Sequence, residues 1–536
     1  MRSRCKKAEC HHTRRQFLGM MGLGSLMYVA ADPINTLFRS VADGLIAKAQ
    51  AAEAGIQPRN YVVAVHYGAP IRWVFDNFLR PEGGSSTFVK NRGMNNYITT
   101  DFYKASDNAN LDYRDARIDL GGGKSIYLPI LWGGTIPTIN SGMMPMASIL
   151  NNTMLVRGID MEVDIGHGAG PALVTRVSDA HPSLTGLVAD ASDRAIPAVG
   201  LTAASRLGGY KSARGTSIAY LEPSWTCTVD KAMDKIIEPF TITDQKVSGS
   251  SANRAKVQAA MDAAMTTLKN YSASSKFGAS ALYDDRYNAE RLFSQNLASL
   301  VTEYNEAVGR YSRLAQESAQ YLQGVIPAGK GLPVWKSGLA SDGGSAGFAA
   351  AEVLLKHSLT STIQFGMGGA AWGLYGAANY NDEHGQTDRV TPVLAHSHQF
   401  RCIAAWLNEF RRQLGTELFK ETLVHVSAEY GRSPDDTGNG TDHAPGATSM
   451  TFFSGAIQEP TFIGNIRINS GVGPYMGTWG SAAPVMTNDG TRVITKKNVG
   501  AGVADILRVA RPTNDKPAFT LESENVVSIS EAPLNV

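Results

Sequence analysis

Short apolar runs rich in β-branched residues recur along the chain and are the first sign of its fold. They cover residues 61–66, 153–158, 361–367 and 422–427. Short runs of this length that are rich in apolar and β-branched residues are typical of strands buried on both faces of a parallel sheet. Helical patterns separate them, so the sequence predicts an α/β fold.

Apolar residues at three- and four-residue spacing predict helices over residues 250–272, 281–324 and 392–415. The third should end at Gly415 as a C-cap, and Ser183 should cap a short helix over 184–191. The longest pattern is carried by Leu297, Leu300, Val301, Tyr304, Val308 and Tyr311. From residue 463 to the end, the pattern predicts only short strands and turns.

The 536 residues exceed the size at which one core stops growing, yet α/β domains with insertions reach this length. We therefore expect a leader and linker over 1–54 and one α/β domain over 55–536. The helices at about 250–326 carry no polar constellation and predict a packed helical insertion, although their length leaves dimerisation through them open. An apolar share of 43% excludes a disordered or fibrous chain.

The leader carries Thr13-Arg14-Arg15-Gln16-Phe17-Leu18 followed by a weakly apolar run over residues 20–31. It resembles a bacterial twin-arginine export signal, which predicts a periplasmic or otherwise exported protein and the twin-arginine translocase as a transient partner. The apolar run is shorter than the ~20 residues that cross a bilayer, so no stable transmembrane span is expected. The alternative is an amphipathic helix over 32–46 that stays on the protein.

Charge and cysteine content narrow the class of protein. The first 49 residues hold 8 of the 50 basic and 3 of the 48 acidic residues, which leaves 42 basic and 45 acidic residues in the body. A slightly acidic body gives no sign of a nucleic-acid partner. In an oxidising compartment Cys227 and Cys402 would form one disulfide if close enough; two buried thiols are the alternative.

Acids and imidazoles follow each of the four predicted strands, whose carboxyl ends would meet at one edge of a parallel sheet. His66 ends the first strand, and His167 comes after the second. The others follow the third and fourth strands: Asp382, His384, Glu429, Arg432, Asp442 and His443. The last four belong to a predicted loop over 427–443 that is held open by glycines. A solvated surface loop would have the same composition.

Mixed carboxylate and imidazole ligands favour a divalent metal, Zn²⁺ or Mn²⁺ rather than Ca²⁺ or Mg²⁺. Two such ions a few Å apart would suit an in-line displacement at a phosphoryl or sulfuryl centre. A nucleophile is not evident. Four hydroxyls near His167 are candidates, and no motif distinguishes them: Thr175, Ser178, Ser183 and Thr185.

Three segments in this order carry a family resemblance: Asp382-Glu383-His384, Ser427-Ala-Glu-Tyr-Gly-Arg-Ser-Pro434 and Gly440-Thr-Asp-His443. They resemble the exported bacterial family called domain of unknown function 1501, which is related to alkaline phosphatases and sulfatases. The resemblance implies a three-layer α/β/α sandwich of alkaline phosphatase-like type with a two-metal site. Its implied ligands are Asp382, His384, Glu429, Asp442 and His443, with Arg432 contacting an anion or supporting a ligand and with weaker agreement at His167. His66 is an additional candidate only from its place at a strand end, where a buried structural histidine is the alternative.

One departure bears on activity. The family's first strand usually ends in a turn that supplies an aspartate, and here His66-Tyr67-Gly68-Ala69-Pro70 stands in its place. The expected function is that of an exported metal-dependent hydrolase acting on a small anionic ester, a phosphate or a sulfate. The alternative is a non-catalytic relative that binds an envelope component, a polysaccharide or a partner protein.

Overall fold

A computed structural model of the chain describes its core. The described residues are 57–66, 115–121, 124–129, 133–140, 142–162, 174–194, 196–201, 209–216, 218–220, 279–323, 343–367, 390–428, 431–434, 441–444, 448–467, 481–487, 490–522 and 525–528. The predicted leader over 1–54 and the predicted helix over 250–272 lie outside these ranges.

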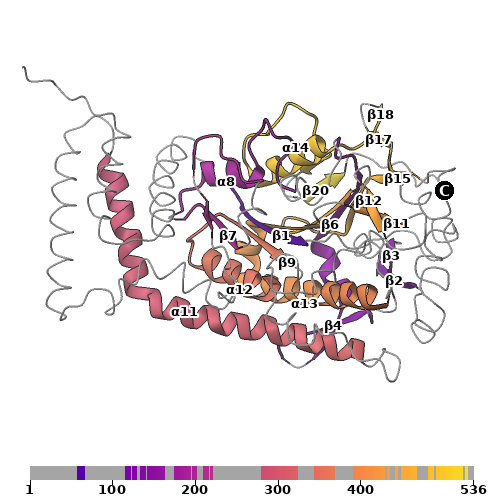
Figure 1. Cartoon of the computed structure of the whole chain (residues 1–536), viewed down its shortest axis with the longest axis horizontal. Coiled ribbons are helices and arrows are strands. Elements are labelled where there is room, and N and C mark those ends of the chain that lie inside the picture. Colours follow the sequence, from indigo (N-terminus) through magenta and orange to yellow (C-terminus); the bar gives the residue numbers. More distant parts are fainter. Residues whose placement is uncertain are drawn as a thin grey trace, which may run out of the picture.

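A central sheet of eight strands organises the fold (Figure 1). From one edge to the other it contains β14 (Thr461–Ile463), β6 (Thr153–Ile159), β13 (Thr448–Phe453), β10 (Thr422–Ala428), β1 (Asn60–His66), β9 (Thr362–Met367), β7 (Ala198–Leu201) and β8 (Ala219–Tyr220). In this sheet β13 runs antiparallel to both of its neighbours, and the other pairs are parallel. The predicted α/β fold is therefore confirmed.

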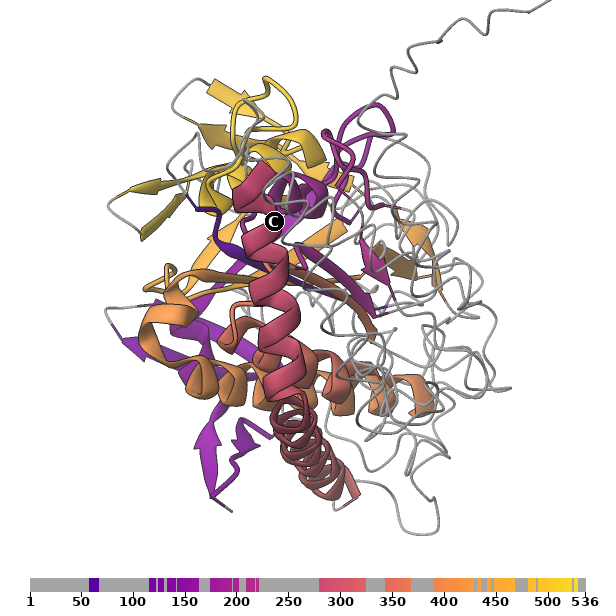
Figure 2. The same ribbon diagram turned by 90° about the vertical axis from the view of Figure 1, so that its left-hand side faces the viewer.

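Helices cover both faces of the sheet (Figure 1). On one face lie α12 (Gly343–Lys356) and α13 (Val390–Lys420), with α11 (Ala279–Gln323) along their outer side (Figures 1 and 2). On the other face lie α8 (Leu184–Ala191) and α14 (Lys496–Leu507). A sheet with continuous apolar strands needs such a layer on each side, because both of its faces must be removed from water.

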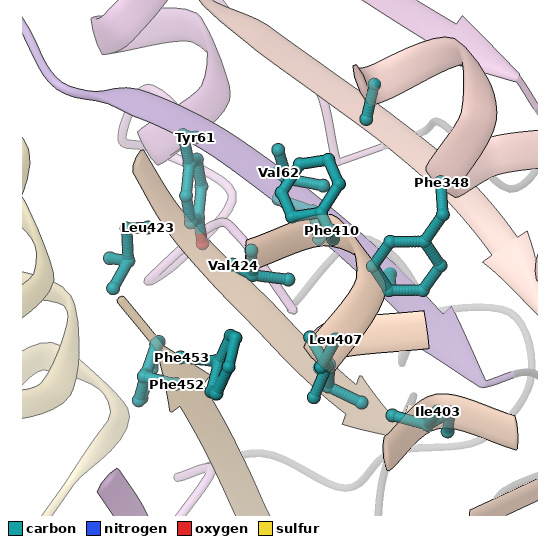
Figure 3. Close-up of a cluster of buried hydrophobic side chains, with 14 of the residues drawn as sticks. Tyr61, Val62, Phe348, Ile403, Leu407, Phe410, Leu423, Val424, Phe452 and Phe453 are labelled. Atoms are coloured by element: carbon teal, nitrogen blue, oxygen red, sulfur yellow. The ribbon is translucent and has the colours of Figure 1, made fainter. Parts of the chain in front are cut away.

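The predicted strands with apolar sequences form the buried centre of the fold. Every residue of β1, β9 and β10 is buried. Val62 of β1 and Val424 of β10 face the side chains of Leu407 and Phe410 on α13 (Figure 3). Phe348 of α12 completes this cluster, with its ring centroid 5.6 Å from that of Phe410.

The long helix α11 buries the face that its spacing predicts. Leu300, Tyr304 and Tyr311 are buried, and Val301 and Val308 are partly buried against the core. The helix packs on α12 and α13, which accounts for these apolar positions within the chain itself.

Short elements surround the sheet. They are the antiparallel ribbons β2 (Asp115–Gly121) with β3 (Lys124–Pro129), β4 (Thr135–Pro137) with β5 (Met143–Pro145), β11 (Gly431–Pro434) with β12 (Thr441–Ala444), β15 (Asn465–Arg467) with β16 (Ser481–Ala483), β17 (Val485–Thr487) with β18 (Gly490–Arg492), and β19 (Phe519–Glu522) with β20 (Asn525–Ser528). A 3₁₀ helix over Met146–Asn152 precedes β6. Ser183 caps α8 as predicted, since its side chain accepts a hydrogen bond from Gly186 N.

The predicted end of the third helix at Gly415 is confirmed. Gly415 leaves helical geometry with φ 69° and ψ 174°, and a second helical segment, which α13 includes, continues beyond this kink to Lys420. A glycine tolerates positive φ, so it can end one helix here and let the next begin at once.

The expectation of only strands and turns after residue 463 is wrong, because this region contains α14. Two glycines weaken the apolar pattern of this helix, and packing requires both. A Cβ on Gly500 would lie 2.4 Å from Val177 Cγ1, and one on Gly502 would lie 2.8 Å from the ring of Phe519. The missed signal is the capping box between Thr495 and Asn498.

Among the described residues, no helix has both the length and the apolar character that crossing a membrane requires. Cys402 is buried in α13, with its sulfur 3.3 Å from His398 Nε2. Cys227 lies outside the described residues, so the disulfide stays a prediction.

Close packing of α12 on the sheet gives a stability prediction. A Cβ on Gly347 would come within 2.2 Å of the Phe365 ring of β9, whereas a Cβ on Gly309 of α11 would meet nothing within 4 Å. We expect Gly347→Ala to lower the free energy of unfolding by about 1–3 kcal/mol. Gly309→Ala should raise it by about 0.4–1 kcal/mol. Urea unfolding of both variants tests this packing, and equal effects of the two would contradict it.

Candidate functional site

The carboxyl ends of four strands lie along one edge of the sheet. In the parallel register, His66 at the end of β1 pairs with Ala428 of β10 on one side and with Met367 of β9 on the other. Strand β6 points the same way, because both β6 and β10 are antiparallel to β13. In open α/β sheets this is the edge at which ligands bind.

This topology brings the starting points of all four candidate segments to one edge. Residues after β6 lead to His167, and those after β9 lead to Asp382 and His384. Residues after β10 lead to Glu429 and His443. His167, Asp382, His384 and Glu429 themselves lie outside the described residues. Their predicted convergence on one ion therefore stays a prediction.

The predicted loop after β10 is in part a two-stranded ribbon, which corrects the expectation of a loop throughout 427–443. The chain leaves β10 at Ala428, forms β11 and returns in β12. Its register places Arg432 opposite His443 and Ser433 opposite Asp442. Cross-strand partners share a face of a ribbon. An arginine and a histidine position thus share one face, next to the carboxyl end of β10.

His66 is the one predicted site residue whose side chain is described. It is completely buried at the last position of β1. Within the described ranges, no three His, Cys, Asp or Glu side chains gather in a way that could hold a metal ion. The side chains of Asp442 and His443 fall outside that description, so this finding does not bear on the predicted ligands.

The structure distinguishes the four candidate hydroxyls. Ser183 Oγ accepts hydrogen bonds from Gly186 N and Lys211 N, each at 2.9 Å, and it lies 2.9 Å from the Thr185 hydroxyl. Ser178 Oγ lies 2.6 Å from His181 Nδ1 within a turn. These contacts hold the start of α8 in place.

Thr175 differs from the other three. It is 1% exposed, and its hydroxyl has no hydrogen-bond partner among the described residues. Its carbonyl accepts a hydrogen bond from Leu184 N at 2.8 Å, which fixes it beside the first turn of α8. A buried hydroxyl without a partner is costly, so its position points to a ligand or water.

A buried lysine that sequence reasoning missed lies near the same edge. The backbone of Asp160, directly after β6, accepts a hydrogen bond from Lys496 N at 3.1 Å. Lys496 is the first residue of α14 and is 3% exposed. Burial, with a smaller contribution from Arg176, lowers the pKa of this lysine well below its usual value, while Asp179 and Glu162 act in the opposite direction.

Two further buried histidines belong to the core. Tyr61 Oη lies 2.7 Å from Nδ1 of His425 in the middle of β10, and the Phe452 ring centroid is 4.6 Å from the imidazole. Burial lowers the pKa of His425 to about 3. On α13, burial and to a lesser extent Arg401 lower the pKa of His398 to about 4. The hydrogen bond to the Ala315 carbonyl acts in the opposite direction and raises this pKa.

These shifts predict acid sensitivity. An imidazole in the unfolded chain has a pKa near 6.5, so unfolding takes up a proton at each histidine once the pH falls below that value. The stabilising contribution of each buried neutral histidine is therefore fully present above pH ~6.5. It is lost as the pH falls towards the pKa of that histidine in the folded protein. We expect His425 to lower the free energy of unfolding by about 2–3 kcal/mol as the pH falls from 7 to 4.5.

Urea unfolding across this range would measure the effect. His425→Leu should have a shallower acid slope than the unmodified protein, whatever its stability at pH 7. An unchanged slope would mean that His425 does not contribute.

Comparison with known protein families places part of the chain. No curated protein matches the chain. The matched segment, residues 350–470, contains β9, α13, β10, the β11–β12 ribbon and β13, and with them Asp382, His384, Glu429, Arg432, Asp442 and His443. This segment matches the family described as "Protein of unknown function (DUF1501)", the family that the three sequence segments resemble.

Proposed function

We propose that the chain is an exported metal-dependent hydrolase of phosphate or sulfate esters, built on an alkaline phosphatase-like sandwich. The observation that carries this proposal is the common direction of β6, β10, β1 and β9. It directs four segments with acids and imidazoles to one edge of the sheet, where α/β proteins bind ligands.

The donor set fits Zn²⁺ or Mn²⁺. His384 and His443 offer imidazole nitrogens, and Asp382, Glu429 and Asp442 offer carboxylates. When bound, such an ion supplies Lewis acidity and lowers the pKa of a water molecule. The ribbon register supports a separate role for Arg432, because its position lies opposite His443. A guanidinium there is suited to hold the anionic group of the ester by paired hydrogen bonds.

One observation favours a second candidate function, that of a non-catalytic binding protein. The first strand ends in a completely buried histidine, His66, where the resembled family supplies an aspartate. Without that carboxylate the site would hold one ion rather than two. The chain would then bind an envelope component, a polysaccharide or a partner protein.

Hydrolysis of aryl phosphates and aryl sulfates by the purified protein separates these functions. We expect turnover that EDTA abolishes and that Zn²⁺ or Mn²⁺ restores. Binding of one ion without turnover on either substrate class would favour the binding protein. Absence of both metal and turnover after reconstitution would reject the hydrolase.

Export is part of the proposal and rests on Arg14 and Arg15. A reporter fused after Ala54 should leave the cytoplasm, and it should stop doing so when both arginines become lysine. Fractionation of cells that express the two fusions measures this directly. Equal export of both fusions would reject the twin-arginine route.

A further inference from the structure

The start of α14 is unusual in its charge. Lys496 and Lys497 occupy its first two positions, and its first turn holds no acid. A helix N-terminus carries partial positive charge, so cations are unfavourable there unless an anion is present. Lys496 is also 3% exposed, and its ammonium group has no hydrogen-bond partner among the described residues.

The nearby carboxylates are already engaged. Glu162 pairs with Lys497 at 3.1 Å, and Asp179 pairs with Arg176. Both acids act electrostatically on Lys496, and neither forms an ion pair with it within the described structure. Arg176 acts on Lys496 with a repulsive charge. Within the described residues, the Lys496 ammonium group therefore has no carboxylate of its own as counterion.

The buried Thr175 hydroxyl belongs to the same neighbourhood. Thr175 precedes Arg176, and the next residue, Val177, contacts α14 at Gly500. The Thr175 carbonyl accepts a hydrogen bond from the backbone N–H of Leu184, the first residue of α8. The starts of α14 and α8, a buried ammonium group and a buried hydroxyl thus lie near one another beside the carboxyl end of β6, and neither polar group has a hydrogen-bond partner in the part of the chain that the structure describes.

We propose that Lys496, Thr175 and Arg176 form a binding site for a phosphate or sulfate group between the starts of α14 and α8. A tetrahedral oxyanion accepts hydrogen bonds from an ammonium, a hydroxyl and a guanidinium at once. It would also satisfy two buried polar groups that have no hydrogen-bond partner among the described residues, and it would offset the repulsion between Lys496 and Arg176. This site needs no metal ion and does not depend on the proposed hydrolysis.

Inorganic phosphate and sulfate are the probes, titrated into the protein in EDTA and followed by calorimetry and thermal unfolding. We expect saturable binding with uptake of a proton, seen as a binding enthalpy that varies with the buffer, because the anion stabilises the charged lysine. Lys496→Met should weaken binding at least tenfold, and Thr175→Val should weaken it less. Lys497→Met is the matched control and should bind like the unmodified protein.

The same titration in a His443→Ala background separates this site from the proposed metal site. Retained binding there, lost again on adding Lys496→Met, is the expected result. Binding that survives Lys496→Met and Thr175→Val, or the absence of any binding in the unmodified protein, would overturn the proposal. Failure of hydrolysis with intact phosphate binding would reject only the hydrolase.

Discussion

Replacing His443 by alanine should lower metal-dependent ester hydrolysis about 100-fold or more. His443 lies in β12, opposite Arg432 and next to the carboxyl end of β10. If it is a ligand, its loss removes an imidazole from the ion that stabilises charge in the transition state. Such stabilisation is worth several kcal/mol, and each 1.36 kcal/mol changes the rate about tenfold. Steady-state kinetics with an aryl phosphate or sulfate measures the change.

His357→Ala is the matched control for this experiment. His357 follows α12 and pairs with Glu303 at 2.8 Å, five residues before β9 begins and therefore towards the other end of the sheet. Its replacement should leave both hydrolysis and metal content unchanged. Full activity and full metal content in His443→Ala would remove this residue from the site.

Replacing Arg310 by methionine should lower the free energy of unfolding by about 1–3 kcal/mol. Arg310 Nη2 of α11 lies 2.5 Å from Glu352 of α12, and its Nε lies 3.2 Å from Glu409 of α13. Both glutamates have side chains only 2% exposed. Without Arg310, two buried carboxylates at the junction of three helices would lose the cation that they share, although Glu409 would keep Arg412 and Glu352 would keep Lys356. Chemical denaturation measures the loss.

A neighbouring exposed pair provides the control. Arg313 pairs with Glu317 at 2.8 Å along the same helix, with side chains 46% and 26% exposed. Arg313→Met should therefore cost about 0.5 kcal/mol or less. Adding Glu352→Gln to Arg310→Met should recover part of the loss, because one of the buried charges is then removed. Equal costs for the two arginines would mean that the buried network does not stabilise the three-helix junction.

The sequence predicts the sheet well because its strands are buried on both faces. Residues 61–65 of β1 form an unbroken apolar run, and Leu423, Val424 and Val426 give β10 most of its strand signal. The strand order is not contained in such a signal. Only the structure places β1 between β10 and β9, and only this order makes their carboxyl ends neighbours. Parallel strands are expected to have their carboxyl ends at one edge of the sheet. Which of these ends are neighbours could not be predicted from the sequence.

The misses have local physical causes. The apolar pattern of α14 is weak because the helix contains Gly500 and Gly502. Only glycine fits at these positions, since Val177 and Phe519, which lie elsewhere in the sequence, pack closely against them. Lys496 was missed for a related reason: a lysine at a helix start is usually solvated, and its burial depends on segments that pack around it. Among the four candidate hydroxyls, that of Thr175 is distinguished because it has no hydrogen-bond partner within the described ranges. That property exists only in three dimensions.

The central claim is that the segments after β9 and β10 share one metal site at the carboxyl edge of the sheet. Crystals grown with Zn²⁺ or Mn²⁺ and measured at the absorption edge of that metal would test it most directly. We predict an anomalous peak at this edge, about 2.0–2.3 Å from ligand atoms of His384, Glu429 and His443. A fully loaded protein whose ions lie elsewhere, or these three residues with no ion among them, would contradict the claim.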